Sequence, residues 1–240
     1  MIPAVVITGD GSSTVLHAGT GEHYHSTFGA IAESMHVFIR NGLHLAGPAA
    51  DPLNVLEVGF GTGLNALLTL LENLNRPRSV SYDAIEPFPL EPAVIRQLNY
   101  PELLGGPETA GWFFRLHAVP PGMRETITPR FSLLKIGSKL EESPLQERRY
   151  HLVYFDAFSP GVQPELWQPL HFSRLFSAMK EGGLLLTYCS KGTVARMLKE
   201  AGFTVDRLPG PPGKRHMLRG MRPFMGSGAR DADPLPAERG

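Results

Sequence analysis

The sequence predicts an α/β protein built on one mostly parallel sheet with helices on both faces. Two observations support this: short apolar runs alternate with helical patterns, and a glycine-rich turn joins the first run to a helix. Strands are expected over residues 54–60, 79–86, 131–137, 151–158 and 183–190, each bounded by Gly, Pro or charge. Helices are expected over residues 64–74, 91–97, 165–178 and 193–201. A ligand of such a sheet is expected at the carboxyl ends of its strands.

The 240 residues, 42% of them hydrophobic, are enough for one domain with a well-buried core. Residues 1–50 are interpreted as an N-terminal arm that contains one helix and covers the ligand site, the alternative being that it only covers a sheet edge. Residues 51–225 are interpreted as the main domain. Proline and glycine interrupt the pattern over residues 100–130, which predicts an insertion with its own hairpin, "WFFRLHAVPPGMRETIT", turning at Pro121-Gly122. Residues 226–240 are poor in apolar side chains and are expected to form a disordered tail.

The overall charge of the chain is balanced, with 23 basic and 23 acidic residues, so a nucleic-acid partner would have to meet a local basic patch. One cysteine and no cluster with metal-ligand spacing predict neither a disulfide framework nor a metal site. No segment approaches the roughly 18 apolar residues of a membrane span. These features predict a cytoplasmic protein, and they leave its oligomeric state open.

The glycine turn "GFGTG" follows a strand and begins a helix, where backbone can approach a ligand at a positive helix end. Its spacing, Gly59, Gly61 and Gly63, differs from the dinucleotide-binding G-x-G-x-x-G and favours a nucleoside without a pyrophosphate. Glu86 ends the second strand, where a carboxylate can accept both hydroxyls of a ribose. Together these features predict S-adenosylmethionine as the cofactor. The alternative is a tight connection with a solvated glutamate.

The fourth strand ends in "YFDAFSPGVQPELW", which places a carboxylate and an aromatic ring at the carboxyl edge of the sheet. Methyl transfer to an amine requires an unprotonated, positioned nitrogen, and Asp156 is suited to orient it and to influence its proton. Phe158 is suited to stack on a planar base. The alternatives are that Asp156 is only a carboxylate in a turn at the strand end and that Phe158 only packs in the core.

Near the end of the chain, "GPPGKRHMLRGMR" forms a local basic patch suited to phosphates, or else a solvated strand end. Its basic residues are Lys214, Arg215, His216, Arg219 and Arg222.

Four segments, "LEVGFGTGLNALLTL", "IEPFPL", "YFDAFSPGVQPELW" and "LKEAGFTVDRLPGPPGKRHML", occur in an order that resembles the methyltransferase domain of the bifunctional MnmC family and its stand-alone relatives. The resemblance implies a Rossmann-like fold of class I S-adenosylmethionine-dependent methyltransferases for residues 51–225, with residues 1–50 covering the cofactor site. It also implies N-methylation of the 5-aminomethyl group of a wobble uridine in tRNA, giving 5-methylaminomethyl-2-thiouridine. The implied partner is the anticodon region of tRNA.

Carried onto this sequence, the resemblance implies catalytic roles for Asp156 and Phe158 and tRNA contacts for Lys214, Arg215, Arg219 and Arg222. The implied cofactor-binding residues are Tyr24, Ser26, Glu33, Glu57, Gly59, Gly61, Gly63, Asn65, Glu86, Ser138 and Asp156.

Two departures from the family pattern bear on this interpretation. Gly137-Ser138 stands where the family usually has Gly-Asp, and a serine carries no charge for the adenine amino group, which predicts a weaker or different adenine contact. The chain also shows no second dinucleotide-binding unit for the flavin-dependent oxidase half. A separate enzyme is therefore expected to supply the 5-aminomethyl substrate.

Two other functions agree with the same residues. One is a methyltransferase that uses the same cofactor on a small-molecule amine, because the neutral charge of the chain does not demand tRNA. A degenerate module that binds cofactor or RNA without transferring methyl is the other alternative, and the Gly137-Ser138 pair favours it.

Overall fold

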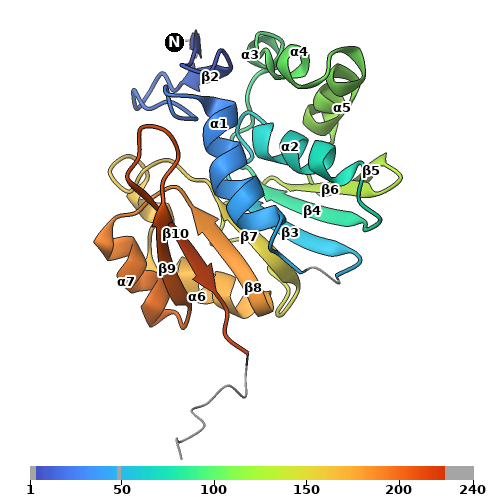
Figure 1. Ribbon diagram of the computed structural model, residues 1–240. Helices are drawn as coiled ribbons and strands as arrows, with labels where there is room; N and C mark the ends of the chain where they lie inside the picture. Colours follow the sequence, from blue (N-terminus) through green and yellow to red (C-terminus); the bar gives the residue numbers. More distant parts are fainter. Residues whose placement is uncertain (1–3, 48–49, 225–240) are drawn as a thin grey trace, which may run out of the picture.

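The computed structural model describes residues 4–47 and 50–224, and its centre is one twisted sheet (Figure 1). Within these residues, eight strands lie in the order β5-β6-β4-β3-β7-β8-β10-β9. The five central strands are parallel, as predicted. They are β6 (Phe131–Ile136), β4 (Val80–Ile85), β3 (Leu53–Val58), β7 (Tyr150–Phe155) and β8 (Met179–Thr187). At the edges, β5 (Arg124–Thr128) is antiparallel to β6, β10 (His216–Met221) to β8, and β9 (Thr204–Pro209) to β10.

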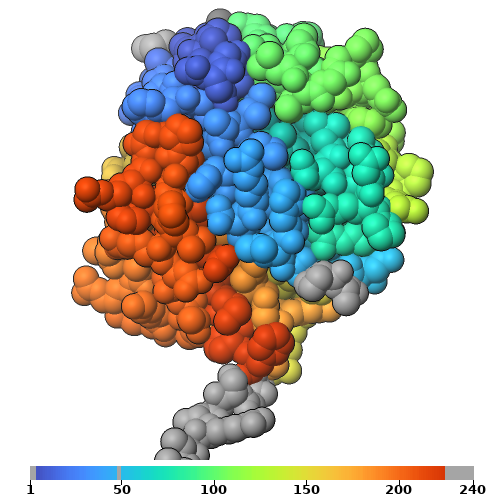
Figure 2. Space-filling view, in the orientation of Figure 1, coloured from blue at the N-terminus to red at the C-terminus, as the bar shows by residue number. Residues whose placement is uncertain are grey.

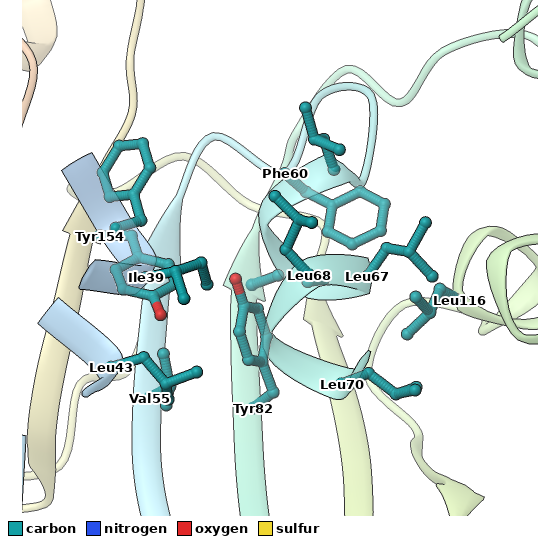
Figure 3. Packing of buried hydrophobic residues seen from close by; sticks show 14 of the residues in the cluster. Ile39, Leu43, Val55, Phe60, Leu67, Leu68, Leu70, Tyr82, Leu116 and Tyr154 are labelled. Carbon is teal, nitrogen blue, oxygen red and sulfur yellow. The ribbon is translucent and has the colours of Figure 1, made fainter. Parts of the chain in front are cut away.

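The central strands are buried along most of their length, with apolar side chains on both faces, because helices cover the sheet on both sides. One face packs against the π-helix η1 (Met35–Leu43), α2 (Leu64–Asn73) and α5 (Pro107–Ala118). The other packs against α6 (Pro169–Ala178) and α7 (Gly192–Glu200). Figure 3 shows the first face, where Val55 and Tyr82 of neighbouring strands meet Leu67 and Leu70 of α2 and Ile39 of η1.

The N-terminal segment folds back to cap its own helix. A hairpin of β1 (Ala4–Ile7) and β2 (Ser13–Leu16) precedes α1 (Ala30–Ser34), which continues into η1. The Asp10 carboxylate accepts the Ala32 N–H at 2.8 Å, and the Ser12 hydroxyl accepts the Ala30 N–H at 3.1 Å. These bonds satisfy N–H groups that the first turn of a helix leaves free. The predicted N-terminal helix is confirmed, with a wider π-helical second half.

The hairpin predicted within residues 100–130 is wrong. Residues 92–118 instead form the helices α3 (Pro92–Ile95), α4 (Tyr100–Leu104) and α5. Pro107 lies at the start of α5, where a proline is tolerated, and Thr109, Phe113 and Leu116 form its buried face at helical spacing. The strand that follows, β5, pairs with β6, so the hairpin lies after Gly122 and not around it.

The helix predicted over 165–178 is also divided. A single 3₁₀ turn, η2 (Pro164–Leu166), precedes α6, which begins at Pro169. The residue before a proline disfavours helical backbone, and Gln168 is extended, with ψ of 145°. The tail predicted at 226–240 lies outside the described residues.

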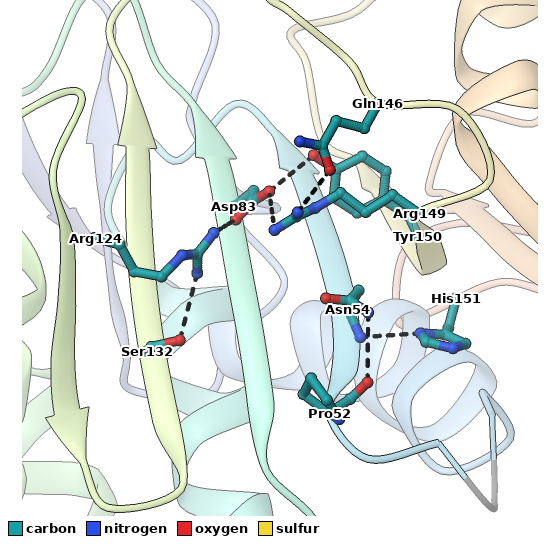
Figure 4. Close-up of polar contacts among 9 residues, drawn as sticks. All are labelled: Pro52, Asn54, Asp83, Arg124, Ser132, Gln146, Arg149, Tyr150 and His151. Carbon is teal, nitrogen blue, oxygen red and sulfur yellow. Dashed lines mark hydrogen bonds and ion pairs between the residues drawn. The ribbon is translucent and has the colours of Figure 1, made fainter.

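A charged cluster crosses the second face of the sheet at β4 (Figure 4). Asp83, which is 3% exposed, forms an ion pair with Arg124 and another with Arg149 at 3.2 Å. The Tyr150 hydroxyl donates to the same carboxylate at 2.8 Å. Three donors around one buried carboxylate compensate for its removal from water and join β5, β4 and β7.

Replacing Asp83 by Asn is expected to destabilise the protein by about 2 to 3 kcal/mol, because two partly exposed arginines lose the buried carboxylate that they share. Urea unfolding of the purified protein measures this. The matched control is Asp206→Asn, which removes a single pair with Arg219 at 49% exposure of the carboxylate. An exposed pair contributes about 0 to 1 kcal/mol, and equal losses in the two variants would contradict the structural role of the Asp83 cluster.

Candidate active site

A cavity of about 650 Å³ opens at the carboxyl ends of the parallel strands. Residues 58–62, 85–88, 139–141 and 156–159 line it, each set directly following or ending a central strand. The arm contributes residues 22–28, and the β9–β10 connection contributes residues 213 and 214. This is the sheet edge at which the sequence predicts a ligand, and the cavity is large enough for a nucleoside with an amino-acid substituent.

The glycine turn after β3 forms one wall of the cavity. Gly59 has φ of 92°, and a Cβ there would lie 2.6 Å from the backbone oxygen of Asp156. Gly61 has φ of 48°, and its Cβ would lie 2.9 Å from the Tyr24 ring. Only glycine suits both positions without displacing a neighbour. The third glycine, Gly63, precedes the first residue of α2 and does not line the cavity.

Glu86, which follows β4, is held against this turn. Its Oε2 accepts the Gly61 N–H and its Oε1 accepts the Phe88 N–H, each at 2.9 Å. Burial raises the pKa of Glu86 despite these bonds. A carboxylate has about four acceptor positions, so each oxygen keeps one for a further donor such as a ribose hydroxyl.

Behind the cavity wall, Asn65 joins two carboxylates. Its amide nitrogen donates to Glu57 at 3.0 Å and to Asp156 at 2.8 Å, and the Tyr82 hydroxyl donates to the other Glu57 oxygen at 2.9 Å. Glu57 is fully buried, and burial raises its pKa well above its usual value. Neither Glu57 nor Asn65 lines the cavity, so their contacts support the position of Asp156 from behind.

Asp156 and Phe158 both line the cavity, at the end of β7. Burial, together with the nearby Glu33 carboxylate, raises the pKa of Asp156 to about 7. The Phe158 ring meets the Tyr24 ring edge-on, with centroids 4.9 Å apart. Trp167 donates its indole N–H to the Phe158 backbone oxygen at 2.7 Å, which fixes this loop. A carboxyl group that titrates near neutral pH is suited to exchange a proton with a substrate.

The N-terminal arm is attached to the cavity by polar contacts. Glu22 accepts the Ser159 N–H at 3.0 Å and also the Ser159 hydroxyl. Glu33 accepts the Ser26 N–H at 2.9 Å and forms an ion pair with Lys214 at 2.5 Å. In the space-filling view, the blue N-terminal surface adjoins the orange-red C-terminal surface (Figure 2). The arm therefore completes the cavity instead of covering a sheet edge alone.

Lys214 also lies over the Tyr188 ring, 3.8 Å from its centroid, and the Tyr188 hydroxyl donates to the Ala157 backbone oxygen at 2.9 Å. Both side chains line the cavity. The sequence reasoning missed Tyr188 and Glu22, since neither belongs to a motif. Their positions after β8 and in the arm were the only signals that could have indicated them.

The other basic residues have separate environments. Arg215 is exposed, and Arg219 pairs with Asp206 at 2.9 Å. Arg222 is 7% exposed and donates to the backbone oxygens of residues 176, 177 and 179. The expectation that Arg222 faces RNA is therefore wrong, because its guanidinium is bonded inside the protein.

Ser138 also differs from its expected position at the cofactor. Its hydroxyl bonds the Ser143 hydroxyl at 3.1 Å, and it does not line the cavity. The next residues, 139–141, do. Within residues 4–47 and 50–224, no group of three or more His, Cys, Asp or Glu side chains is arranged to hold a metal ion. No helix in that part of the chain is long and apolar enough to span a membrane.

Comparison with known proteins assigns this site to a family. A family model described as S-adenosyl-L-methionine-dependent methyltransferase matches residues 125–223. The chain is 32% identical to the tRNA 5-methylaminomethyl-2-thiouridine biosynthesis bifunctional protein MnmC of Burkholderia mallei over 249 residues, covering 92% of this chain and 35% of that protein. The protein of the same name from Ectopseudomonas mendocina is 32% identical over 238 residues, covering 88% of this chain and 36% of that one. The chain thus spans about a third of the length of these curated relatives.

Solved structures agree with this assignment. The crystal structure of MNMC2 from Aquifex aeolicus has a TM-score of 0.74 and 28% identity, over 94% of this chain and 73% of that one. Spermidine synthase from Thermotoga maritima shares the fold alone, with a TM-score of 0.53 and 14% identity over 92% of this chain and 69% of that one.

The parallel sheet, the glycine turn and the cavity at its carboxyl edge define a class I S-adenosylmethionine-dependent methyltransferase. Within that class, the chain belongs to the family of the MnmC methyltransferase domain. The resemblance expected from the sequence is confirmed. The site fits the cofactor, because the cavity is large enough for a nucleoside with an amino-acid substituent and Glu86, which lines it, keeps free acceptor positions.

Glu86→Ala is expected to weaken S-adenosylmethionine binding about 10- to 150-fold, the effect of losing about 1.5 to 3 kcal/mol of hydrogen bonding to a charged group. Isothermal titration calorimetry measures the affinity. Glu108→Ala, a change at an exposed residue outside the cavity, is the control. Unchanged affinity in Glu86→Ala would remove the ribose role from this carboxylate.

The raised pKa of Asp156 also predicts a pH dependence of stability. Because the folded pKa, about 7, exceeds the ordinary value of 3.8, the unfolded chain loses this proton first as pH rises. Stability contributed by the protonated carboxyl is therefore present at low pH and is lost as pH rises through about 7. Asp156→Asn cannot titrate, so its unfolding free energy relative to wild type should be higher at pH 8 than at pH 5. A pH-independent difference in urea unfolding would show that burial does not perturb Asp156.

Proposed function

We propose that the protein transfers a methyl group from S-adenosylmethionine to the 5-aminomethyl group of the wobble uridine in tRNA, giving 5-methylaminomethyl-2-thiouridine. The observation that carries the proposal is the pairing of Asp156 with Phe158 at the end of β7, inside the cavity of a family whose named relatives belong to that biosynthesis. The cofactor supplies an electrophilic methyl group. Side chains of the cavity position the amine and accept its proton.

The carboxylates of the cavity bring the amine to the site as a cation, since aliphatic amines have pKa values near 10. The nitrogen must then lose a proton, because only its free lone pair can form the new bond to carbon while the carbon–sulfur bond breaks. Asp156, with a pKa of about 7, is suited to accept that proton and release it to water after the reaction. Phe158 gives the uracil ring an apolar surface, and Asn65 holds the acceptor carboxylate from behind.

Labelled methyl transfer to bulk tRNA from cells that lack this modification tests the proposal, with nucleoside analysis of the product. Label in 5-methylaminomethyl-2-thiouridine supports it. No label in tRNA, from protein that binds S-adenosylmethionine, contradicts it. The 5-aminomethyl group is the acceptor of this reaction and not its product, so we propose that another catalytic unit supplies it. We place the reaction in the cytoplasm, where tRNA is the substrate.

A small-molecule amine is the second candidate, and the charge of the cavity favours it. Its lining contains more carboxylates than cations, the cations being Lys139 and Lys214. The carboxylates are Glu22, Glu33, Glu86, Glu141, Asp156 and Glu165. Such a lining attracts ammonium groups and repels phosphates. Salt separates the two candidates: KM for tRNA should rise steeply with salt through counterion release, whereas KM for a small amine should change little.

A further inference from the structure

Phe28 lies at the mouth of the cavity with most of its ring in water. It lines the cavity and is 62% exposed, whereas Phe158 and Tyr24 lie deeper and contact each other. A single exposed apolar side chain is common on protein surfaces. Phe28 differs because its ring is seated against the backbone of Gly213 and because two cationic residues, Lys214 and Arg215, follow Gly213 in the chain.

The backbone beneath the Phe28 ring leaves room for it. Gly213, in the β9–β10 connection, has φ of 82°, and a Cβ at that position would overlap the Phe28 ring. The Phe28 N–H donates to the Ser26 hydroxyl at 3.2 Å. The adjacent Glu33–Lys214 ion pair joins the same two segments. The ring is therefore ordered before any ligand arrives, which lowers the entropic cost of binding.

Two cationic residues, Lys214 and Arg215, directly follow Gly213, on which the Phe28 ring rests. Lys214, next to Gly213, points into the cavity toward Glu33 and Tyr188. Arg215, the following residue, is exposed, and its backbone oxygen accepts the Gly210 N–H at 3.0 Å, which closes the loop. Figure 1 shows this connection reaching the same end of the molecule as the N-terminal segment. An exposed aromatic ring with an exposed arginine two residues along the adjoining loop offers a surface for the base and a charge for the phosphate of a single-stranded nucleotide.

We infer that the Phe28 ring, seated on Gly213, stacks on the base next to the target uridine, while Arg215 contacts the adjoining phosphate. This inference rests on the proposed tRNA substrate. Seating one uracil in the cavity removes it from the base stack, so its neighbour loses a stacking partner. The Phe28 ring replaces that partner outside the cavity, and the positive charge of Arg215 complements the phosphate locally in a protein whose total charge is balanced.

The test compares Phe28→Ala, Phe28→Leu and Phe28→Tyr on two substrates, tRNA and the isolated 5-aminomethyluridine nucleoside. Loss of one base stack is expected to raise KM for tRNA about tenfold in Phe28→Ala. Phe28→Tyr, which keeps a ring, should stay near wild type, and Phe28→Leu should resemble Phe28→Ala. The increase should be several-fold smaller with the nucleoside, which has no neighbouring base. Phe114→Ala, at an exposed phenylalanine of α5 outside the cavity, is the matched control.

Arg215→Ala gives an independent readout. It should raise KM for tRNA and lower the slope of log KM against log salt by about one, because one phosphate contact is lost. A Phe28→Ala variant that behaves like Phe114→Ala overturns the inference, as do equal losses on tRNA and nucleoside. In both cases wild type still methylates tRNA, so the proposed function stands. Wild-type protein that leaves tRNA unlabelled overturns the proposed function, and the inference with it.

Discussion

Asp156→Asn is expected to lower the rate of methyl transfer about 10²- to 10⁴-fold, the range that a positioned proton acceptor contributes. Asparagine keeps the shape of the side chain, and its amide oxygen can still accept from Asn65, which bonds Asp156 at 2.8 Å. It cannot accept a proton from the substrate amine. Single-turnover measurement with saturating S-adenosylmethionine isolates this step from binding. Affinity for the cofactor should change less than about threefold.

Glu108→Gln provides the control for the loss of one carboxylate from the protein, since Glu108 is exposed and does not line the cavity. A raised pH should partly restore the Asp156→Asn rate, because hydroxide then takes over deprotonation of the amine. An Asp156→Asn enzyme with the wild-type single-turnover rate would show that transfer does not need Asp156 as a proton acceptor. The backbone of the same loop would then be the remaining group near the amine.

Gly59→Ala is expected to give the largest combined loss of stability and binding. Its Cβ would lie 2.6 Å from the Asp156 backbone oxygen, and its φ of 92° is costly for alanine. The ends of β3 and β7 must then separate, which weakens the bond from the Asp156 N–H to the Val58 oxygen, now 3.0 Å. We expect a loss of about 2 to 4 kcal/mol in urea unfolding and more than tenfold in cofactor affinity.

Gly111→Ala is the matched control, because a Cβ at Gly111 meets no atom within 4 Å. Gly111 lies within α5, where alanine is favoured over glycine by about 1 kcal/mol, so this variant should be slightly more stable than wild type. If Gly59→Ala matched the stability of wild type, the turn would have to be able to relax away from Asp156. The close approach of the two strands would then not depend on glycine.

The fold was predictable because its signals are local. Parallel strands covered on both faces are continuous apolar runs, and this pattern located all five central strands. The failure at "WFFRLHA" has the opposite cause: aromatic residues favour a strand, but Phe113 and Leu116 find a buried helical face against the rest of the domain. The preferences of the individual residues for strand or helix contain no information about that packing.

The residues of the candidate site likewise fall into those that the sequence predicts and those that it does not. Gly59, Glu86 and Asp156 were predictable because each follows a strand, and the carboxyl ends of parallel strands share one edge. Contacts between distant segments were not predictable, since Glu33 and Lys214 are 181 positions apart. A cluster of basic residues in the sequence also does not tell which of them reach the site. Lys214 lines the cavity, whereas the Arg222 guanidinium is hydrogen-bonded inside the protein.

The attachment of the arm by Glu22 and Glu33 has a consequence for how the protein opens. Two side chains, Glu22 and Glu33, join the arm to the loops at residues 159 and 214, whereas η1, at the end of the arm, packs Phe38 and Ile39 into the core. Release of residues 22–28 alone thus uncovers the cavity and leaves η1 and the sheet folded. Slow hydrogen exchange should accordingly persist in β3, β7 and η1 under conditions that expose the amides of residues 22–28, and cofactor binding should slow exchange in that segment first.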